Sequence, residues 1–187
     1  NMLLLNVPVA VGSQEQYAMN TITKSWCNFT GWNANCWALY GNNIYFGGST
    51  YIGKAWDTNS DNNGVIAGNF LQAFNYFGSR SREKAFVQMR PVLSTNGSPS
   101  VSTKLNIDFD LSDPTSPASF SPTNYGVWGT GLWGGALWGA DSSITQAWQG
   151  ASGIGRCAAP HLLTQSQGMT LQWLSTDVLW RPGSVFG

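Results

Sequence analysis

Charged side chains are scarce in this sequence. Nine Lys or Arg and nine Asp or Glu residues make up 10% of the 187 residues and give a formal net charge of zero, whereas an average domain has about 25% charged residues. Low charge together with 13% aromatic residues excludes an intrinsically disordered chain, which needs the opposite composition. The sequence shows no basic stripe that could neutralise phosphates, so it gives no electrostatic reason to predict a nucleic-acid-binding protein.

Cysteine and histidine are also few. The cysteines Cys27, Cys36 and Cys157 have no CxxC spacing, and His161 is the only histidine. A disulfide framework or a zinc site needs more of these residues. We expect buried, reduced thiols, with a Cys27–Cys36 bridge as the alternative, and a structural role for His161 at a strand edge. No metal or other cofactor is predicted.

Long apolar runs are missing as well. No stretch of about 18 apolar residues is present, so the sequence predicts no transmembrane helix. The apolar start (NMLLLNVPVAV) lacks the positive charge that opens a signal peptide, and its β-branched residues favour a strand. Because this strand begins directly at Asn1, we expect the chain to be a fragment of a longer protein.

Catalytic motifs are equally hard to find. The sequence has neither the G-x-S-x-G elbow of a serine hydrolase nor a GxxxxGK[ST] phosphate loop. A GxGxxG match at residues 129–134 lacks the strand-then-helix context of a nucleotide site. Residues 57–61 (DTNSD) resemble the start of a calcium loop without its glycine and glutamate. We interpret the acidic run Asp108, Asp110 and Asp113 as a solvated face, and we predict no enzymatic activity.

Short strands separated by turns dominate the N-terminal part. Aromatic and β-branched runs alternate with Asn- and Gly-rich turns. This pattern predicts strands at residues 2–9, 16–20, 25–29, 36–40, 44–46 and 50–56. Leu3, Leu5 and Val7 are expected to share one face of the first strand. Such a meander is typical of propeller blades, barrels or sandwiches.

The second part, residues 65–187, also predicts antiparallel strands. In residues 101–111 (VSTKLNIDFDL) the alternation places one set of side chains inward and the other, including Asn106, outward. The inward set is Val101, Thr103, Leu105, Ile107 and Phe109. Residues 169–180 carry apolar residues on both faces, so we expect this strand to be covered on both sides and to pair with residues 155–164 as the last hairpin.

A charged loop precedes another predicted strand. Residues 78–84 (GSRSREK) contain Arg80, Arg82, Glu83 and Lys84, four of the eighteen charged residues of the chain. We expect a hairpin loop into a strand at residues 85–91, in which Phe86 faces the side opposite to Met89. Because an acidic residue lies inside the cluster, a solvated tip or an interface loop is favoured over a phosphate site.

A tryptophan repeat follows a Pro- and Ser-rich connector at residues 112–123. Trp-Gly pairs recur with a spacing of five within residues 127–139, a period of neither helix nor strand, which predicts a looped ladder with glycines at its corners. Buried indole rings whose N–H groups reach carbonyls are favoured. The alternative is an exposed platform that stacks on sugar rings.

Five segments, taken together and in this order, carry a resemblance to a known family: QYAMNTITKSWCNFTGWNANCW…IYFGG, AFNYFGSRSREKAFVQMRPVL, VWGTGLWGGALWG, GIGRCAA and WLSTDVLWRPGSVFG. On these segments nearly the whole chain resembles the C-terminal part of tail nozzle proteins of short-tailed phages (podoviruses). Such proteins are also called tail tubular protein B or packaged-DNA stabilisation proteins. The tryptophan repeat and the STDVLW-x-PG ending are the more specific parts of the resemblance.

The resemblance implies a structural virion protein of the phage tail, without enzymatic activity and assembled in the host cytoplasm. It implies that residues 1–60 end a β-propeller-like domain built from antiparallel meander blades. Residues 65–187 would then form an antiparallel β-sandwich-like region.

Proteins of this kind form a homo-oligomeric ring, usually a hexamer, below the portal and adaptor. Genomic DNA is retained in the channel of the ring and conducted through it at ejection, without sequence-specific binding. A neutral composition is consistent with a channel wall that does not grip DNA. The alternative is a carbohydrate-binding β-module of the phage tail used in host attachment. On this chain the expected subunit-interface or channel-facing residues are Arg80, Arg82, Lys84, Trp128, Trp133 and Trp138.

Overall fold

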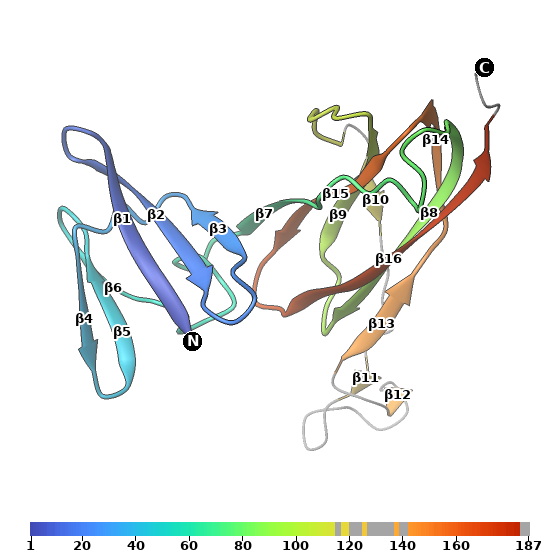
Figure 1. Cartoon of the computed structure of the whole chain (residues 1–187). Helices are drawn as coiled ribbons and strands as arrows, with labels where there is room; N and C mark the ends of the chain where they lie inside the picture. The colour runs from blue at the N-terminus through green and yellow to red at the C-terminus, as the bar shows by residue number, and fades with distance from the viewer. Residues whose placement is uncertain (115–116, 120–124, 127–136, 139–141, 184–187) are drawn as a thin grey trace. The chain divides into compact units, whose positions relative to one another are not determined.

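The computed structural model describes residues 1–114, 117–119, 125–126, 137–138 and 142–183. All regular structure within these residues is β-strand, which confirms the predicted all-β class. The sheets are small and antiparallel, apart from one two-stranded parallel pair. The chain divides into two compact units, Asn1–Asp57 and Thr58–Gly187 (Figure 1).

The first unit consists of two three-stranded meanders in which strands adjacent in sequence pair with each other. One meander contains β1 (Met2–Ala10), β2 (Ser13–Asn20) and β3 (Trp26–Phe29), and the other contains β4 (Cys36–Tyr40), β5 (Asn43–Gly47) and β6 (Ile52–Lys54). Gly41 and Asn42, between β4 and β5, have φ of 54° and 63°. Positive φ at both residues is what a two-residue I′ hairpin turn requires. The six strands predicted for this region are confirmed, with the last one shorter than predicted.

The core of the first unit is a small aromatic cluster. The Trp32 ring stacks between the rings of Phe29 and Phe46, with centroid distances of 4.9 and 5.0 Å. Gly53 approaches the same cluster so closely that a Cβ there would lie 2.4 Å from Cζ of Phe46. The two sheets are joined by the Trp37 indole N–H, which donates to a side-chain oxygen of β1. Few apolar side chains are therefore fully enclosed in this unit.

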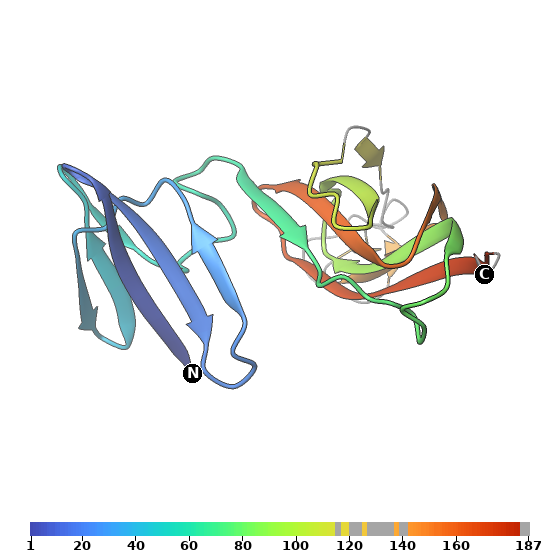
Figure 2. The same ribbon diagram turned by 45° about the horizontal axis from the view of Figure 1, so that its top comes forward.

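The second unit contains two larger antiparallel sheets. One has the order β10-β9-β15-β7, and in the other β8 pairs with β16 along one edge and with β13 and β14 along the opposite edge (Figure 2). The strands are β7 (Ile66–Leu71), β8 (Lys84–Thr95), β9 (Ser100–Ile107), β10 (Pro117–Ser119), β13 (Ser143–Gln146), β14 (Gln149–Gly155), β15 (Ala158–Ser166) and β16 (Leu171–Pro182). The remaining strands, β11 (Tyr125–Gly126) and β12 (Leu137–Trp138), form the parallel pair.

Several connections in this unit cross from one sheet to the other. The chain leaves one sheet after β7, enters the other as β8, and returns as β9; it crosses again between β14 and β15 and between β15 and β16. The hairpins predicted at residues 78–84 and 165–168 are therefore wrong, because each of these loops joins strands of different sheets. Turn residues indicate where a chain reverses, but they do not indicate with which strand the next one pairs.

The two sheets of the second unit share a core. One cluster contains Phe86 and Met89 of β8, Leu105 of β9 and Ala158 of β15. A second cluster contains Leu93 of β8, Val101 of β9 and Leu162 of β15. Because each cluster takes side chains from both sheets, the two faces bury each other.

A β-bulge in β8 decides which of its side chains enter this core. Opposite β16, Gln88 pairs with Leu179 and Phe86 pairs with Trp180, so Val87 is an extra residue of β8. An extra residue reverses the alternation of side chains along a strand. Phe86 and Met89 both point inward as a result, and the prediction that they face opposite sides is wrong.

A second bulge explains the apolar residues on both faces of β16. Leu174 is the extra residue there and is 54% exposed. Before it, Leu171 and Trp173 pack on one core cluster; after it, Val178 and Trp180 pack on the other. The inward face changes at the bulge, so the prediction that this strand is covered on both sides is wrong.

Strand β9 ends at Ile107, earlier than predicted. Asp108 and Phe109 follow with φ of 49° and 66°, and the N–H of Asp110 donates to the Ile107 carbonyl at 3.0 Å. This tight turn leaves Phe109, which was predicted to point inward, 60% exposed. Asn106, which was predicted to point outward, is fully buried. Asn106 is buried because its side chain belongs to a polar network around His161.

Candidate functional site and interaction surfaces

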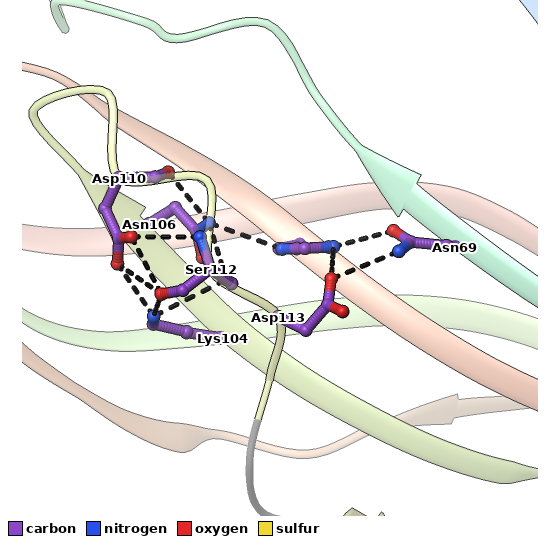
Figure 3. Close-up of polar contacts among 7 residues, drawn as sticks. Asn69, Lys104, Asn106, Asp110, Ser112 and Asp113 are labelled. Carbon is purple, nitrogen blue, oxygen red and sulfur yellow. Dashed lines mark hydrogen bonds and ion pairs between the residues drawn. The ribbon is translucent and has the colours of Figure 1, made fainter.

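The single histidine lies in a polar network on one sheet of the second unit (Figure 3). His161 belongs to β15, which pairs with β9 and β7 on its two sides, and its side chain is buried. Its Nε2 lies 2.7 Å from Oδ1 of Asn69 on β7, and Nδ2 of Asn69 donates to Oδ1 of Asp113 at 3.1 Å. The predicted strand-edge position of His161 is therefore wrong, because β15 is an interior strand.

Asn106 approaches the other side of the imidazole ring. Its Nδ2 lies 3.3 Å from Nδ1 of His161 and also donates to the backbone carbonyls of Asp110 and Ser112, at 2.9 and 3.0 Å. An amide nitrogen can only donate. The Oδ1 of Asn69 can only accept, so Nε2 of His161 carries the hydrogen of the hydrogen bond to Asn69. Both ring nitrogens are thus used by side-chain amides of the same domain.

A charged pair fixes the adjoining turn. Nζ of Lys104 donates to Oδ2 of Asp110 at 2.7 Å, and the N–H of Ser112 donates to Oδ1 at 2.9 Å. The hydrogen bond from Lys104, followed by those from Ser112, holds the pKa of Asp110 well below its usual range. The carboxylate is exposed, so the pair contributes mainly to the shape of the turn.

These contacts give the network a structural role in the described chain. It ties the turn after β9 to strands β15 and β7 and leaves no free ring nitrogen for a reactant. The acidic run was predicted as a solvated face. Its three residues are exposed, but their carboxylates contact other groups of the chain. Asp108 accepts the N–H groups of Arg156 and Cys157, while Asp110 and Asp113 belong to the network. No local sequence signal identifies these partners, because the strands that carry them are 44 to 92 residues apart.

Lys84, predicted as an interface or channel-facing residue, is buried. Its Nζ donates to the backbone carbonyls of Ser79, Arg82 and Arg156, at 2.6, 3.0 and 3.0 Å. It also lies 5.8 Å from the ring centroid of Trp180. The ammonium group therefore joins the loop at residues 78–84 to the turn before β15, and the prediction of an outward role for Lys84 is wrong.

Arg80 and Arg82, in the same loop, are exposed. The guanidinium of Arg80 lies 4.9 Å from the ring centroid of Tyr76, a cation–π contact. Their interface or channel-facing role stays a prediction.

The tryptophan repeat falls largely outside the residues that the structure describes. Trp128 and Trp133 are among those not described. The backbone of Leu137 and Trp138 forms β12, which pairs in parallel with β11. The interface role of these three tryptophans stays a prediction.

Strand β1 carries an apolar stripe. The sequence predicts the face that these side chains share, but it does not show what surrounds them. The Leu3, Leu5 and Val7 side chains of β1 share one face and are 39 to 41% exposed, and Val9 follows as the extra residue of a β-bulge. The strand pairs only with β2 in the described chain, so its other edge has no strand partner there. The strand contains no charged residue. This combination makes β1 the clearest candidate for contact with another chain.

The cysteines differ in environment. Cys157 is buried, as predicted, but Cys27 and Cys36 are exposed, and all three are free thiols. The two exposed cysteines belong to different sheets, β3 and β4. Within the described residues no group of three or more His, Cys, Asp or Glu side chains could hold a metal ion. No helix within the described part of the chain is long and apolar enough to cross a membrane.

No protein-family model, curated protein sequence or solved structure matches this chain. The comparisons therefore assign the chain to no family.

Proposed function

We propose that this chain is a structural subunit of a phage tail nozzle ring. In this role it takes part in a homo-oligomer, with six copies as the expected number, that contacts the portal, the adaptor and other tail proteins. The ring surrounds the channel that retains the genomic DNA and conducts it at ejection. The resemblance of five sequence segments motivates this proposal, and the all-β architecture agrees with it.

The observation that carries the proposal is the exposed apolar edge of β1. A long edge strand offers unpaired N–H and C=O groups to another chain, and soluble monomers usually protect such edges with charges, bulges or short strands. β1 has nine residues and no charge, and its bulge at Val9 lies near the end of the strand, which leaves residues 2–7 as a regular edge. Covering its three half-exposed apolar side chains would contribute on the order of 2–5 kcal/mol, which supports an edge used for assembly.

The finer architecture belongs to the same proposal. Each three-stranded meander of the first unit is one strand short of a four-stranded propeller blade, so a strand paired with the free edge of β1 would complete one blade. The shared core between the two sheets of the second unit supports a β-sandwich-like region.

Imaging of native particles by electron microscopy tests the function directly. We expect six copies in a ring on the particle axis beneath the portal. Copies at peripheral fibre or spike positions would refute the nozzle role, and binding to host glycans would then become the leading function.

A matched pair of variants tests the role of β1. Leu5→Lys places a charge on the stripe, whereas Val11→Lys places it in the adjoining turn, where the side chain is fully exposed. We expect Leu5→Lys, but not Val11→Lys, to abolish the assembled species in mass photometry. Equal assembly of both variants and the unchanged chain would exclude β1 as the contact.

A further inference from the structure

We propose that one end of the second unit, here called the arginine end, binds the phosphate backbone of nucleic acid without sequence preference. The arginine end is defined by the exposed side chains Arg80, Arg82, Arg156 and Arg181. That this nucleic acid is the DNA in the channel rests on the proposed function. The surface itself rests on the contacts that bring these residues together.

Three separate segments meet at the arginine end. The buried ammonium of Lys84 donates to the backbone carbonyls of Arg82 and Arg156, which holds the backbone of these two arginines on either side of it. Arg181 on β16 pairs with Ala85, the residue after Lys84. Arg80 and Arg156 line the same depression, which has a volume of about 320 Å³. The fold therefore gathers cations that are up to 101 positions apart in the sequence.

Three other cations of the chain have acidic partners, which these guanidinium groups and Lys24 lack among the described residues. Arg90, Lys104 and Lys54 each form an ion pair with an aspartate. For the four arginines of the arginine end, no carboxylate oxygen of the described residues lies within 4.0 Å. Asp108, which lines the same depression as Arg80 and Arg156, already accepts two backbone N–H groups through Oδ1. The arginine end thus has unneutralised positive charge.

The zero net charge of the chain conceals this asymmetry. Together with Lys84, the arginine end contains five of the nine cationic residues but only two of the nine acidic ones, Glu83 and Asp108. The rest of the chain is left with more acidic than basic residues. The sequence shows no basic stripe because the residues of the arginine end lie in separate segments of the chain.

Arginine favours phosphate as the ligand. Its planar guanidinium donates two parallel hydrogen bonds to phosphate oxygens, and all four exposed cations of this end are arginines. The described elements that carry them are loops and strand ends, with no helix that could enter the major groove, so the expected contacts are to the backbone and carry no sequence information.

Salt-dependent DNA binding by the full 187-residue chain tests this inference. The probe is a fluorescein-labelled 20-base-pair duplex of random sequence, measured by anisotropy between 50 and 200 mM NaCl. Each phosphate contact contributes about −0.9 to the slope of log K against log salt, so four contacts give about −3.6 and roughly 100-fold weaker binding over this range. We expect Arg80→Gln/Arg82→Gln to reduce the magnitude of the slope by about 1.8.

The matched control is Lys24→Gln/Lys54→Gln, which removes the same charge from the first unit and is expected to leave the slope unchanged. An equal loss in this control, or an unchanged slope in the arginine variant, would overturn the inference. Tighter binding of a poly-glutamate peptide than of the duplex would overturn it in favour of an acidic protein partner.

The inference and the proposed function fail in different ways. A ring on the particle axis formed by a chain that binds no DNA overturns the arginine end alone. Salt-dependent DNA binding by a chain found at peripheral positions supports the arginine end and refutes the nozzle role.

Discussion

Replacing Lys84 by Met tests whether a buried ammonium holds one end of the second unit together. Met keeps a flexible apolar stem of similar length beside Trp180 and removes the three donors of the ammonium group. The carbonyls of Ser79, Arg82 and Arg156 lose their hydrogen bonds. Since this contact links the loop at residues 78–84 to the turn before β15, the variant should loosen both segments at once.

The expected cost follows from the number and kind of bonds. A hydrogen bond that involves a charged group contributes about 1.5–3 kcal/mol, and a buried carbonyl left without a donor costs about 1–3 kcal/mol. The three contributions are not additive, because the loop lies at the surface and water can reach some of the carbonyls once the side chain is gone. We therefore expect Lys84→Met to lower the free energy of unfolding by about 1.5–3 kcal/mol, the range for a hydrogen bond that involves a charged group.

Urea denaturation followed by tryptophan fluorescence measures this loss. Arg90→Met is the matched control, because Arg90 binds Asp177 at 2.6 Å in a half-exposed ion pair, which is worth about 0.2–1 kcal/mol. Hydrogen exchange at residues 79–82 should accelerate in Lys84→Met and stay unchanged in the control. A loss in Lys84→Met no greater than that of Arg90→Met would refute the reasoning.

Further predictions concern single side chains of known environment. The bonds that lower the pKa of Asp110 stabilise the fold above the ordinary pKa of a carboxyl and are lost as the pH falls below about 4. Asp110→Asn should therefore show a smaller decrease in unfolding midpoint between pH 4 and pH 2. Burial, aided by Asp108, raises the pKa of Cys157. Titration with a thiol reagent at pH 8 should show two fast cysteines and a third at least about tenfold slower until the chain is unfolded. Gly53→Val should destabilise the first unit by about 1–3 kcal/mol in thermal unfolding, because the side chain would enter the Phe46 ring.

The first unit could be predicted from local signals. Strand Cys36–Tyr40 has the bounds that the sequence predicts, since aromatic and β-branched residues are followed by a Gly-Asn turn that fits a two-residue hairpin. In a meander each strand pairs with its sequence neighbour, so a correct turn also gives the correct pairing. The local pattern therefore contained the pairing within each meander, but not the division into two sheets between β3 and β4.

The second unit could not be predicted in the same way. Its bulges at Val87 and Leu174 add one residue to one strand of a pair, a change that depends on the partner strand and not on local propensity. Simple alternation therefore placed Phe86 and Met89 on opposite faces, whereas both point into the core. The sequence also does not show the contacts of His161 and Lys84 with distant residues. These contacts depend on how distant strands and the two sheets come together.

The structure of the first unit links its stability to assembly. A unit of 57 residues lies in the size range where a single core is only marginally stabilising, and the cluster around Trp32 encloses only two alanines and one phenylalanine completely. The apolar stripe of β1 stays half exposed at the same time. A partner that binds the folded strand and not the unfolded chain stabilises the unit in proportion to the logarithm of its concentration over its dissociation constant. The same side chains that leave the isolated unit weak would therefore stabilise it in a ring, so that folding of this unit and assembly of the proposed oligomer would be coupled.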